Sequence, residues 1–193
     1  MAMRVILTNS LLKYYLLIKR RITNKLARNN KYKEINKVAK GTVLMREEKV
    51  KIIPLGGLGE IGKNITVFEC DDEIIVVDCG IAFPDEEMYG VDLIIPDISY
   101  LKNNVKKIKG IFLTHGHEDH IGSLPYVLKE VNVPIYGTKL TIGIVKTKLE
   151  EHNLLSEVKL HNVEAGDVIK FDKFKVEFIR NTHSIADSCS LAI

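Results

Sequence analysis

The sequence predicts an α/β domain whose short strands end near residues suited to binding metal. Most of the chain after residue 49 divides into apolar runs of strand length, separated by turn residues. Two segments between these runs are expected to be helices, one from a candidate N-cap and one from apolar residues at helical spacing. Aspartate or histidine follows shortly after three of the strands. The chain of 193 residues is long enough for one such domain with an appendage.

The expected strands are short and include two hairpins. Acidic or charged turns at residues 71–72 and 172–173 each separate two apolar runs, which is typical of a hairpin. The strands are expected over residues 50–55, 64–70, 73–77, 109–113, 133–136, 158–160, 168–171, 173–179 and 189–193.

Two helices are expected between the strands. The first covers residues 119–130, with Asp119 as its N-cap and with Pro125 ending or kinking its first segment. The second covers residues 139–152, where Leu140, Ile144 and Leu149 follow helical spacing.

The charge distribution separates a basic N-terminal extension, residues 1–48, from a domain over residues 49–193. Residues 1–51 hold 14 Lys/Arg and 3 Asp/Glu, whereas the remainder holds 14 and 22. Such an arm attracts nucleic acid or anionic lipid, or it is simply a solvated helix or a disordered tail. Met45 immediately precedes the first strand, so we also consider it as an alternative start of translation.

Composition indicates a cytoplasmic protein that does not enter the membrane. The apolar run at residues 11–18 is too short to span a bilayer, and no small-residue cleavage site follows it. Cys70, Cys79 and Cys189 are odd in number and form no CxxC motif. They are expected to be buried, reduced thiols.

Three histidines and an aspartate lie close together after the strand at residues 109–113. His115 and His117 are two positions apart at the strand end, so their rings can lie on the same side. Asp119 and His120 follow in the next helix and approach from a second direction. Imidazole and carboxylate are ligands of zinc and similar metals, and this spacing favours two adjacent ions. Two metals at a strand end are typical of hydrolysis.

Asp78 and His183 follow two other strands and are candidates for the same site. Asp78 directly follows a buried strand, where an unpaired carboxylate is costly. It either binds metal, orients a ligand, or caps a turn before Gly80. His183 comes shortly after the strand at residues 173–179 and is a candidate metal ligand. His152 and His161 lack such placement and are expected at the surface.

The glycine-rich segment at residues 57–62 fits the GxGxxG pattern, with an aspartate about twenty residues further on. In a dinucleotide site a helix must follow the glycines, but residues 64–68 are rich in strand-forming residues. We therefore expect a loop whose backbone N–H groups border the site.

Longer motifs resemble those of the metallo-β-lactamase superfamily and, within it, the ribonuclease J family of β-CASP ribonucleases. The similarity covers roughly residues 48–193. It is carried by residues 54–64, 78–85, 117–126 and 183–188 in addition to the histidine cluster. The resemblance implies an αββα sandwich, of which this chain would form an incomplete, first half.

The same resemblance implies the metal ligands and the reaction. His115, His117 and His183 would hold one zinc, and Asp119 and His120 a second, with Mn²⁺ or Mg²⁺ as alternatives. Asp78, Asp119 and His120 would be the catalytic residues, with Asp78 supporting the metal ligands. The implied activity is 5′–3′ exoribonuclease and endoribonuclease cleavage of RNA, in rRNA processing and mRNA decay. The full-length family is expected to form homo-oligomers in the cytoplasm.

Several parts of the family pattern have no counterpart here. The bridging aspartate, the final metal histidine, the β-CASP domain and the C-terminal domain would all lie beyond Ile193. We therefore expect weak binding of the second metal and low activity, or none, for this chain alone. Two alternatives remain: a thioester or lactam hydrolase of the same superfamily, and a non-catalytic remnant whose basic arm binds RNA.

Overall fold

The computed structural model describes residues 6–7 and 49–193. The expected helical or disordered extension over residues 1–48 lies outside the described residues, apart from residues 6–7. The proposed alternative start at Met45 lies outside them as well.

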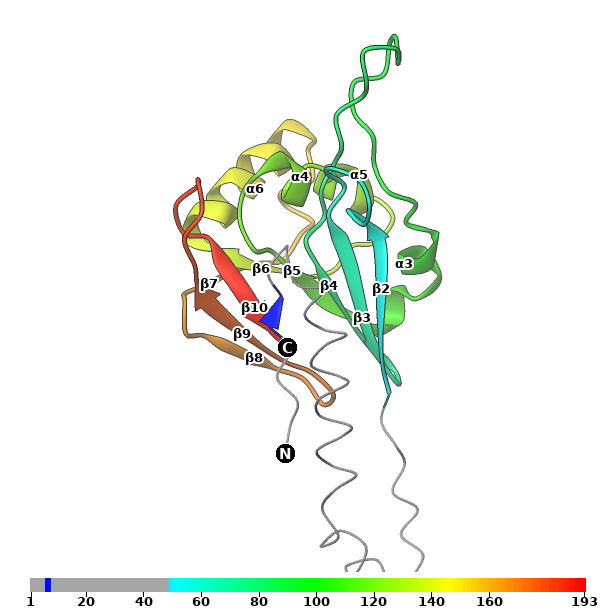
Figure 1. The fold of residues 1–193 in the computed structure, drawn as a ribbon. Helices are drawn as coiled ribbons and strands as arrows, with labels where there is room; N and C mark the ends of the chain where they lie inside the picture. The colour runs from blue at the N-terminus through cyan, green and yellow to red at the C-terminus, as the bar shows by residue number, and fades with distance from the viewer. Residues whose placement is uncertain (1–5, 8–48) are drawn as a thin grey trace, which may run out of the picture. The chain divides into compact units, whose positions relative to one another are not determined.

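Six strands form the larger sheet, in the order β2-β3-β4-β5-β6-β7 (Figure 1). The first three are antiparallel neighbours, and the pairs β4–β5, β5–β6 and β6–β7 are parallel. The hairpin predicted at residues 71–72 is confirmed between β3 and β4. The strands are β2 (Val50–Gly56), β3 (Ile65–Cys70), β4 (Glu73–Val77), β5 (Ile108–Phe112), β6 (Ile135–Thr138) and β7 (Leu160–Val163).

The smaller sheet contains four strands in the order β1-β10-β9-β8. β8 and β9 pair antiparallel and confirm the second predicted hairpin, and β9 pairs antiparallel with β10. The strands are β1 (Ile6–Leu7), β8 (Val168–Lys170), β9 (Lys175–Arg180) and β10 (Cys189–Ala192).

Helices follow the parallel strands. The predicted second helix is confirmed as α6 (Lys139–Glu151), whereas sequence periodicity gave no indication of α3 (Ser99–Asn103) or of the 3₁₀ turn η1 (Val105–Lys107). The helix predicted over residues 119–130, with an interruption at Pro125, is observed as two short helices, α4 (Glu118–Ile121) and α5 (Leu124–Val127); the interruption is as expected, but the predicted end at residue 130 is wrong.

The break between α4 and α5 lies before Pro125 and has a tertiary cause. The Ser123 N–H donates to the carbonyl of Cys79, 3.0 Å away, so it leaves the helical hydrogen-bond ladder. Pro125 then occupies the first turn of α5, where its missing N–H costs nothing. The predicted N-cap is also wrong: His117 has extended backbone and precedes the helix, while Asp119 lies inside the first turn.

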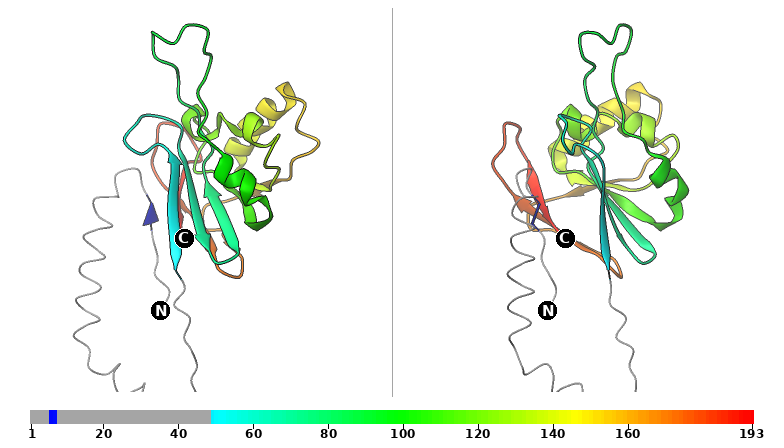
Figure 2. Two further views of the ribbon diagram at one scale, coloured as in Figure 1. Left: turned by 90° about the vertical axis from the view of Figure 1, so that its right-hand side faces the viewer. Right: turned by 45° about the vertical axis from the view of Figure 1, so that its right-hand side comes forward.

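The two faces of the larger sheet pack against different layers. One face carries Val67, Val76 and Ile111, which share a buried cluster with residues of α5 and α6. The other face carries Phe112, whose ring contacts Phe178 of β9 at a centroid distance of 6.2 Å. Helices, larger sheet and smaller sheet thus form successive layers (Figure 2). The predicted fold class is confirmed, with the described residues supplying the helix–sheet–sheet part of an αββα sandwich.

Two further expectations concern burial and the membrane. All three cysteines are buried, as expected, and burial raises the pKa of the Cys79 thiol to about 12. Within residues 6–7 and 49–193, no helix is both long enough and apolar enough to cross a bilayer.

An ion-pair network around the buried carboxylate of Glu69 connects β2 and the segment after α3 to β3. Glu69 is 4% exposed and accepts hydrogen bonds from Lys51 Nζ at 3.0 Å and Lys107 Nζ at 3.1 Å, and also from the Tyr100 hydroxyl. The Tyr100 hydrogen bond, opposed by burial and aided by the two lysines, lowers the pKa of Glu69 from 4.5 to about 2. In the folded chain, Glu69 therefore stays ionised at pH values well below the ordinary pKa of a glutamate.

Glu69→Gln is expected to lower the free energy of unfolding by about 2 kcal/mol at neutral pH. A carboxylate with a depressed pKa stabilises the fold above its unfolded pKa, and this stabilisation is lost as the pH falls through the folded value. The stability difference between wild type and Glu69→Gln should therefore shrink between about pH 4.5 and about pH 2. Urea unfolding over this range measures it. The exposed Glu157, changed to Gln, is the control, and a pH-independent difference would contradict the prediction.

Candidate metal centre

The candidate site lies where β5 and β9 lead into loops. β4 and β5 are parallel, so Asp78 and the segment from Thr114 to His117 leave the larger sheet at the same edge. β9 belongs to the smaller sheet, and its chain continues to His183. The structure thus brings together residues separated by up to 105 positions, as expected from their places after strand ends.

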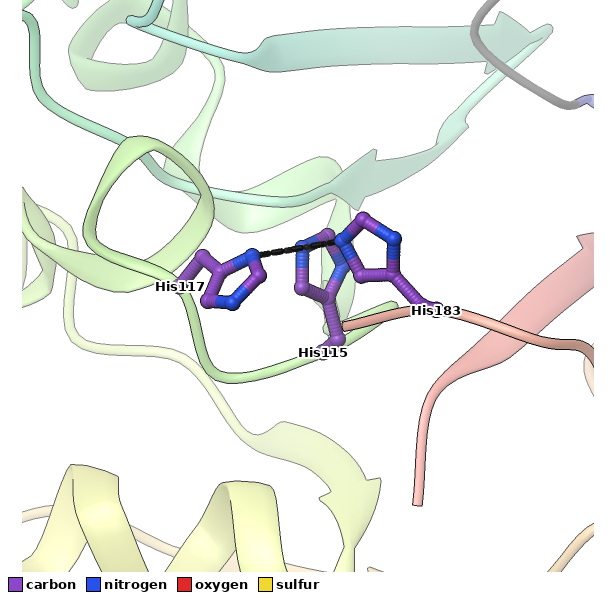
Figure 3. A group of neighbouring side chains, drawn as sticks. All are labelled: His115, His117 and His183. Carbon is purple, nitrogen blue, oxygen red and sulfur yellow. Dashed lines mark hydrogen bonds between the residues drawn. The ribbon is translucent and has the colours of Figure 1, made fainter. Parts of the chain in front are cut away.

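The ring nitrogens of His115, His117 and His183 converge on one point (Figure 3). His115 Nε2 lies 3.1 Å from His117 Nδ1 and 3.0 Å from His183 Nε2, and the latter two nitrogens are 3.2 Å apart. Three neutral imidazoles cannot satisfy all three nitrogens by hydrogen bonds among themselves, because each ring has a single N–H. A tetrahedral zinc about 2.0–2.1 Å from each nitrogen would separate the nitrogens by about 3.3–3.4 Å. The donor set therefore fits a divalent cation.

His115 is the buried member of this triad. Burial, followed by repulsion from the neighbouring rings of His120, His183 and His117, lowers the pKa of His115 from 6.5 to about 3. The ring is therefore neutral at physiological pH, and one nitrogen keeps a lone pair for a cation. His117 is half-buried and His183 is exposed, so the triad opens toward solvent on their side.

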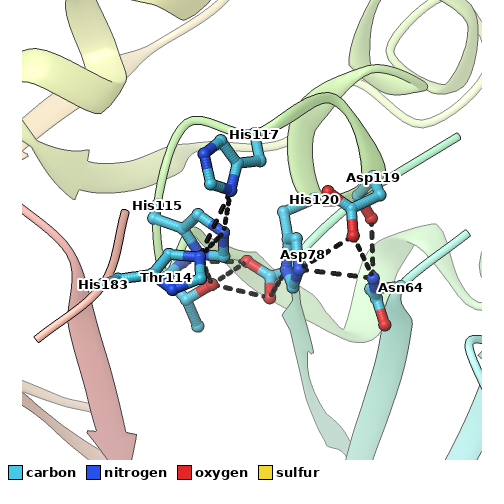
Figure 4. A network of polar contacts seen from close by, with 8 residues as sticks. All are labelled: Asn64, Asp78, Thr114, His115, His117, Asp119, His120 and His183. Atoms are coloured by element: carbon cyan, nitrogen blue, oxygen red, sulfur yellow. Dashed lines mark hydrogen bonds and ion pairs between the residues drawn. The ribbon is translucent and has the colours of Figure 1, made fainter. Parts of the chain in front are cut away.

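Asp78 orients two of the histidines (Figure 4). Its Oδ1 accepts the Thr114 N–H at 2.8 Å and its Oδ2 accepts the Thr114 hydroxyl at 2.8 Å. Because that hydroxyl donates to Asp78, its oxygen can accept the N–H of His115 Nδ1, which lies 2.9 Å away. His115 Nε2 is then the lone-pair nitrogen that faces the triad. Asp78 also accepts a hydrogen bond from His120 Nδ1 at 2.8 Å, which directs Nε2 of that ring away from the aspartate.

His120 and Asp119 form a second group beside the triad. The ring centroid of His120 is 4.1 Å from that of His115, and His120 Nε2 is 3.4 Å from Asp119 Oδ2. Burial disfavours the charged form of His120, but the hydrogen bond and negative charge of Asp78, together with Asp119, outweigh it and raise the pKa. Both predicted residues are thus adjacent to the triad, where His120 Nε2 and Asp119 Oδ2 lie close together.

Strained backbone and interlocking hydrogen bonds hold this group in place. Asp78 has φ 60°, a conformation that is uncommon without glycine and is often found at functional sites. The N–H of Cys79 donates to the carbonyl of His120 at 2.7 Å, and that of Ile81 donates to Glu118 at 3.1 Å. The segment after β4 therefore fixes the start of α4 directly through its backbone.

The glycine-rich loop reaches the site at its end. No helix follows the glycines, because β3 begins at Ile65, as the strand-forming residues there predicted. The Gly57 N–H is accepted by Glu60 within the loop. Only at Asn64 does the loop border the site: its backbone N–H donates to the Asp119 carbonyl at 3.1 Å. The backbone N–H of Asn64 thus borders the site as expected of this loop, whereas the N–H of Gly57 is used within the loop.

Two participants were missed by sequence reasoning, although both lie inside motifs that it identified. Thr114 links Asp78 to His115, and Asn64 donates through its side chain to Asp119. Thr114 was signalled only by its place directly before His115, and Asn64 only by its place at the end of the glycine-rich motif. The two histidines expected at the surface lie outside the site: His161 is exposed and stacks on Tyr136, and His152 is partly exposed and packs on Tyr126.

Comparisons with known proteins agree with this geometry. Residues 58–186 match the metallo-beta-lactamase superfamily. The chain is 53% identical over 146 residues to a protein named Ribonuclease J from Synechocystis sp., covering 75% of this chain and 23% of that protein. It is 47% identical over 148 residues to Ribonuclease J 2 from Staphylococcus saprophyticus, covering 77% and 27%. The chain thus spans about a quarter of the length of these relatives.

A solved structure shows the same fold at lower sequence similarity. A protein of unknown function from Enterococcus faecalis V583 superimposes with a TM-score of 0.56 at 19% identity, covering 74% of this chain and 40% of that one. This likeness concerns the fold alone.

Proposed function

This chain belongs to the metallo-β-lactamase superfamily, and we propose from this premise that it is a metal-dependent ribonuclease of the ribonuclease J type. The superfamily implies binding of a divalent metal, and the convergence of three imidazole nitrogens within 3.0–3.2 Å of one another is the observation that carries the proposal. The identity of 53% to a protein named Ribonuclease J supports RNA as the substrate. The proposal extends to zinc as the cation, the cytoplasm as the compartment and self-association of the full-length protein.

The proposed roles follow from the donor atoms. His115, His117 and His183 would hold the first cation, and Asp119 and His120 the second. Bound cations would supply Lewis-acid activation of water and neutralise charge on the phosphodiester. Residues 49–193 would then be the N-terminal part of the metallo-β-lactamase domain, preceded by the basic extension.

The chain's own residues would prepare this chemistry. Asp78 holds the N–H of His120 Nδ1 and, through Thr114, that of His115 Nδ1, so both Nε2 lone pairs face the site. The carboxylate of Asp119 is partly exposed beside them and can accept a proton from an attacking water. The exposed side of the triad is where a phosphodiester would approach.

Cleavage of 5′-monophosphorylated RNA by the purified chain tests the proposal. We expect slow, cation-dependent release of nucleotides or fragments, abolished by a chelator and restored by zinc or manganese. His117→Ala should be inactive, while His161→Ala, which removes a histidine outside the site, should match wild type.

Two results would contradict this function. Hydrolysis of a thioester or lactam with no cleavage of RNA would indicate a different hydrolase. RNA binding without cleavage that weakens steeply with salt, survives chelation and His117→Ala, and disappears on deletion of residues 1–44 would indicate a non-catalytic RNA-binding chain.

A further inference from the structure

The side chain of Asn64 reaches both residues proposed for the second cation (Figure 4). Its Nδ2 donates to Asp119 Oδ2 at 3.1 Å and lies 3.3 Å from His120 Nε2. These are the same two atoms that face each other at 3.4 Å beside the histidine triad. The amide nitrogen thus lies within hydrogen-bond distance of both prospective ligand atoms.

The amide cannot satisfy all of its neighbours. Nδ2 has two hydrogens, but a third acceptor, the carbonyl of Asp119, lies 3.0 Å away. When the His120 ring is neutral, donation of its Nδ1 N–H to Asp78 leaves the Nε2 lone pair facing the amide. The two amide hydrogens are therefore divided among three acceptors. Asp119 Oδ2 and His120 Nε2 thus keep lone pairs that a cation could use.

The fold fixes the place of this amide. The Asn64 N–H donates to the Asp119 carbonyl at 3.1 Å, and the Asn64 carbonyl accepts the Gly80 N–H at 3.1 Å. Lys63, directly before it, adopts φ 51°, which an ordinary side chain seldom does, so the chain bends sharply there. The position of the amide is thus set by backbone contacts to the segments that carry Asp78 and Asp119.

We propose that Asn64 is a positioning residue that holds Asp119 and His120 in the arrangement that binds the second cation. The inference rests on the proposed function, because it requires that second cation. Partners that orient a metal ligand without touching the metal typically contribute 10- to 100-fold in affinity. Asn64 would act on the second ion alone, because its side-chain contacts are to Asp119 and His120 and not to the triad.

Titration with Co²⁺, followed by calorimetry and by the visible absorption of the bound ion, tests this inference. Wild type should bind two ions with separable affinities. Asn64→Ala should keep the affinity of the first ion and lower that of the second about 10- to 100-fold. The matched control is Asn132→Ala, which removes an exposed asparagine whose amide donates to the Glu157 carbonyl at 3.1 Å. That control should bind both ions as wild type does.

Asn64→Asp distinguishes positioning from a general structural role. It places a carboxylate oxygen, a ligand for divalent cations, where the amide nitrogen stands, so the second ion should bind more tightly than it does to Asn64→Ala. Without cation its melting temperature should fall, because two carboxylates then face each other with no hydrogen between them. A merely structural asparagine would give a lower melting temperature and a weaker second ion together.

The outcomes separate this inference from the proposed function. An Asn64→Ala chain that binds the second ion like wild type, or a wild-type chain that binds one ion only up to millimolar Co²⁺, overturns it. An Asn64→Asp chain that binds the second ion no better than Asn64→Ala also overturns it. Selective loss of the second ion in a chain that leaves RNA intact supports the inference while refuting the substrate.

Discussion

Removal of His117 or His183 is expected to lower the affinity for the first divalent cation by more than about 100-fold. Loss of a group that only hydrogen-bonds to a metal ligand already lowers the affinity about 10- to 100-fold. Each residue supplies one of three nitrogens that converge within 3.0–3.2 Å. Two imidazoles leave a zinc ion with fewer protein ligands than its catalytic sites ordinarily have. Metal content after gel filtration, together with competition against a chromophoric chelator, measures the loss in His117→Ala and His183→Ala.

The control for this experiment is a histidine of similar exposure outside the site. His161 stacks on Tyr136 at the edge of the larger sheet, so His161→Ala should bind the cation like wild type. Because His183 is exposed, its removal should change the stability of the metal-free chain by no more than about 0.5 kcal/mol. Full metal content in either triad variant would contradict the assignment of these histidines as ligands.

Gly80→Ala is expected to destabilise the fold by about 3 kcal/mol or more and to displace Asp119 and His120. A Cβ at this position would lie 1.6 Å from the Asp119 carbonyl oxygen and 2.7 Å from the His120 nitrogen. Both atoms belong to backbone, which cannot rotate away as a side chain can. The segment after β4 and the start of α4 must therefore separate, which breaks the hydrogen bond from Cys79 to His120.

Chemical unfolding without metal, followed by titration with Co²⁺, measures both effects of Gly80→Ala. Gly143 provides the matched control, because it lies within α6 and a Cβ there meets no atom within 4 Å. Gly143→Ala should stabilise the chain by about 0.5–1 kcal/mol through helix propensity. Equal stabilities for the two variants would show that the close approach at Gly80 is not required.

The placement of the histidine cluster could be predicted because it depends on local rules. His115 and His117 alternate at the end of a strand, and Asp78 follows five consecutive buried residues of β4. The carboxyl ends of parallel neighbours meet at one edge, so proximity followed from the strand assignments. The structure brings Asp78, the triad, Asp119 and His120 together, while their chemical roles stay predictions.

The parts that were not predicted depend on contacts between distant segments. The end of α4 is set by the carbonyl of Cys79, which lies 44 positions before Ser123, so no local pattern announces it. Asn64 meets Asp119 across 55 positions for the same reason. The short helix α3 lacks apolar periodicity, and its first turn is marked only by Asp97, whose carboxylate accepts the Ser99 N–H at 2.8 Å.

The triad draws its nitrogens from both sheets, so a bound ion would connect the two sheets as well as take part in the chemistry. His115 and His117 continue from the larger sheet, whereas His183 continues from the smaller one. An ion held by all three histidines would link the two sheets. Any ligand that binds only the folded state shifts the folding equilibrium toward that state. Scarcity of the metal would then shorten the lifetime of the folded chain, so metal supply would set how much protein persists, independently of turnover.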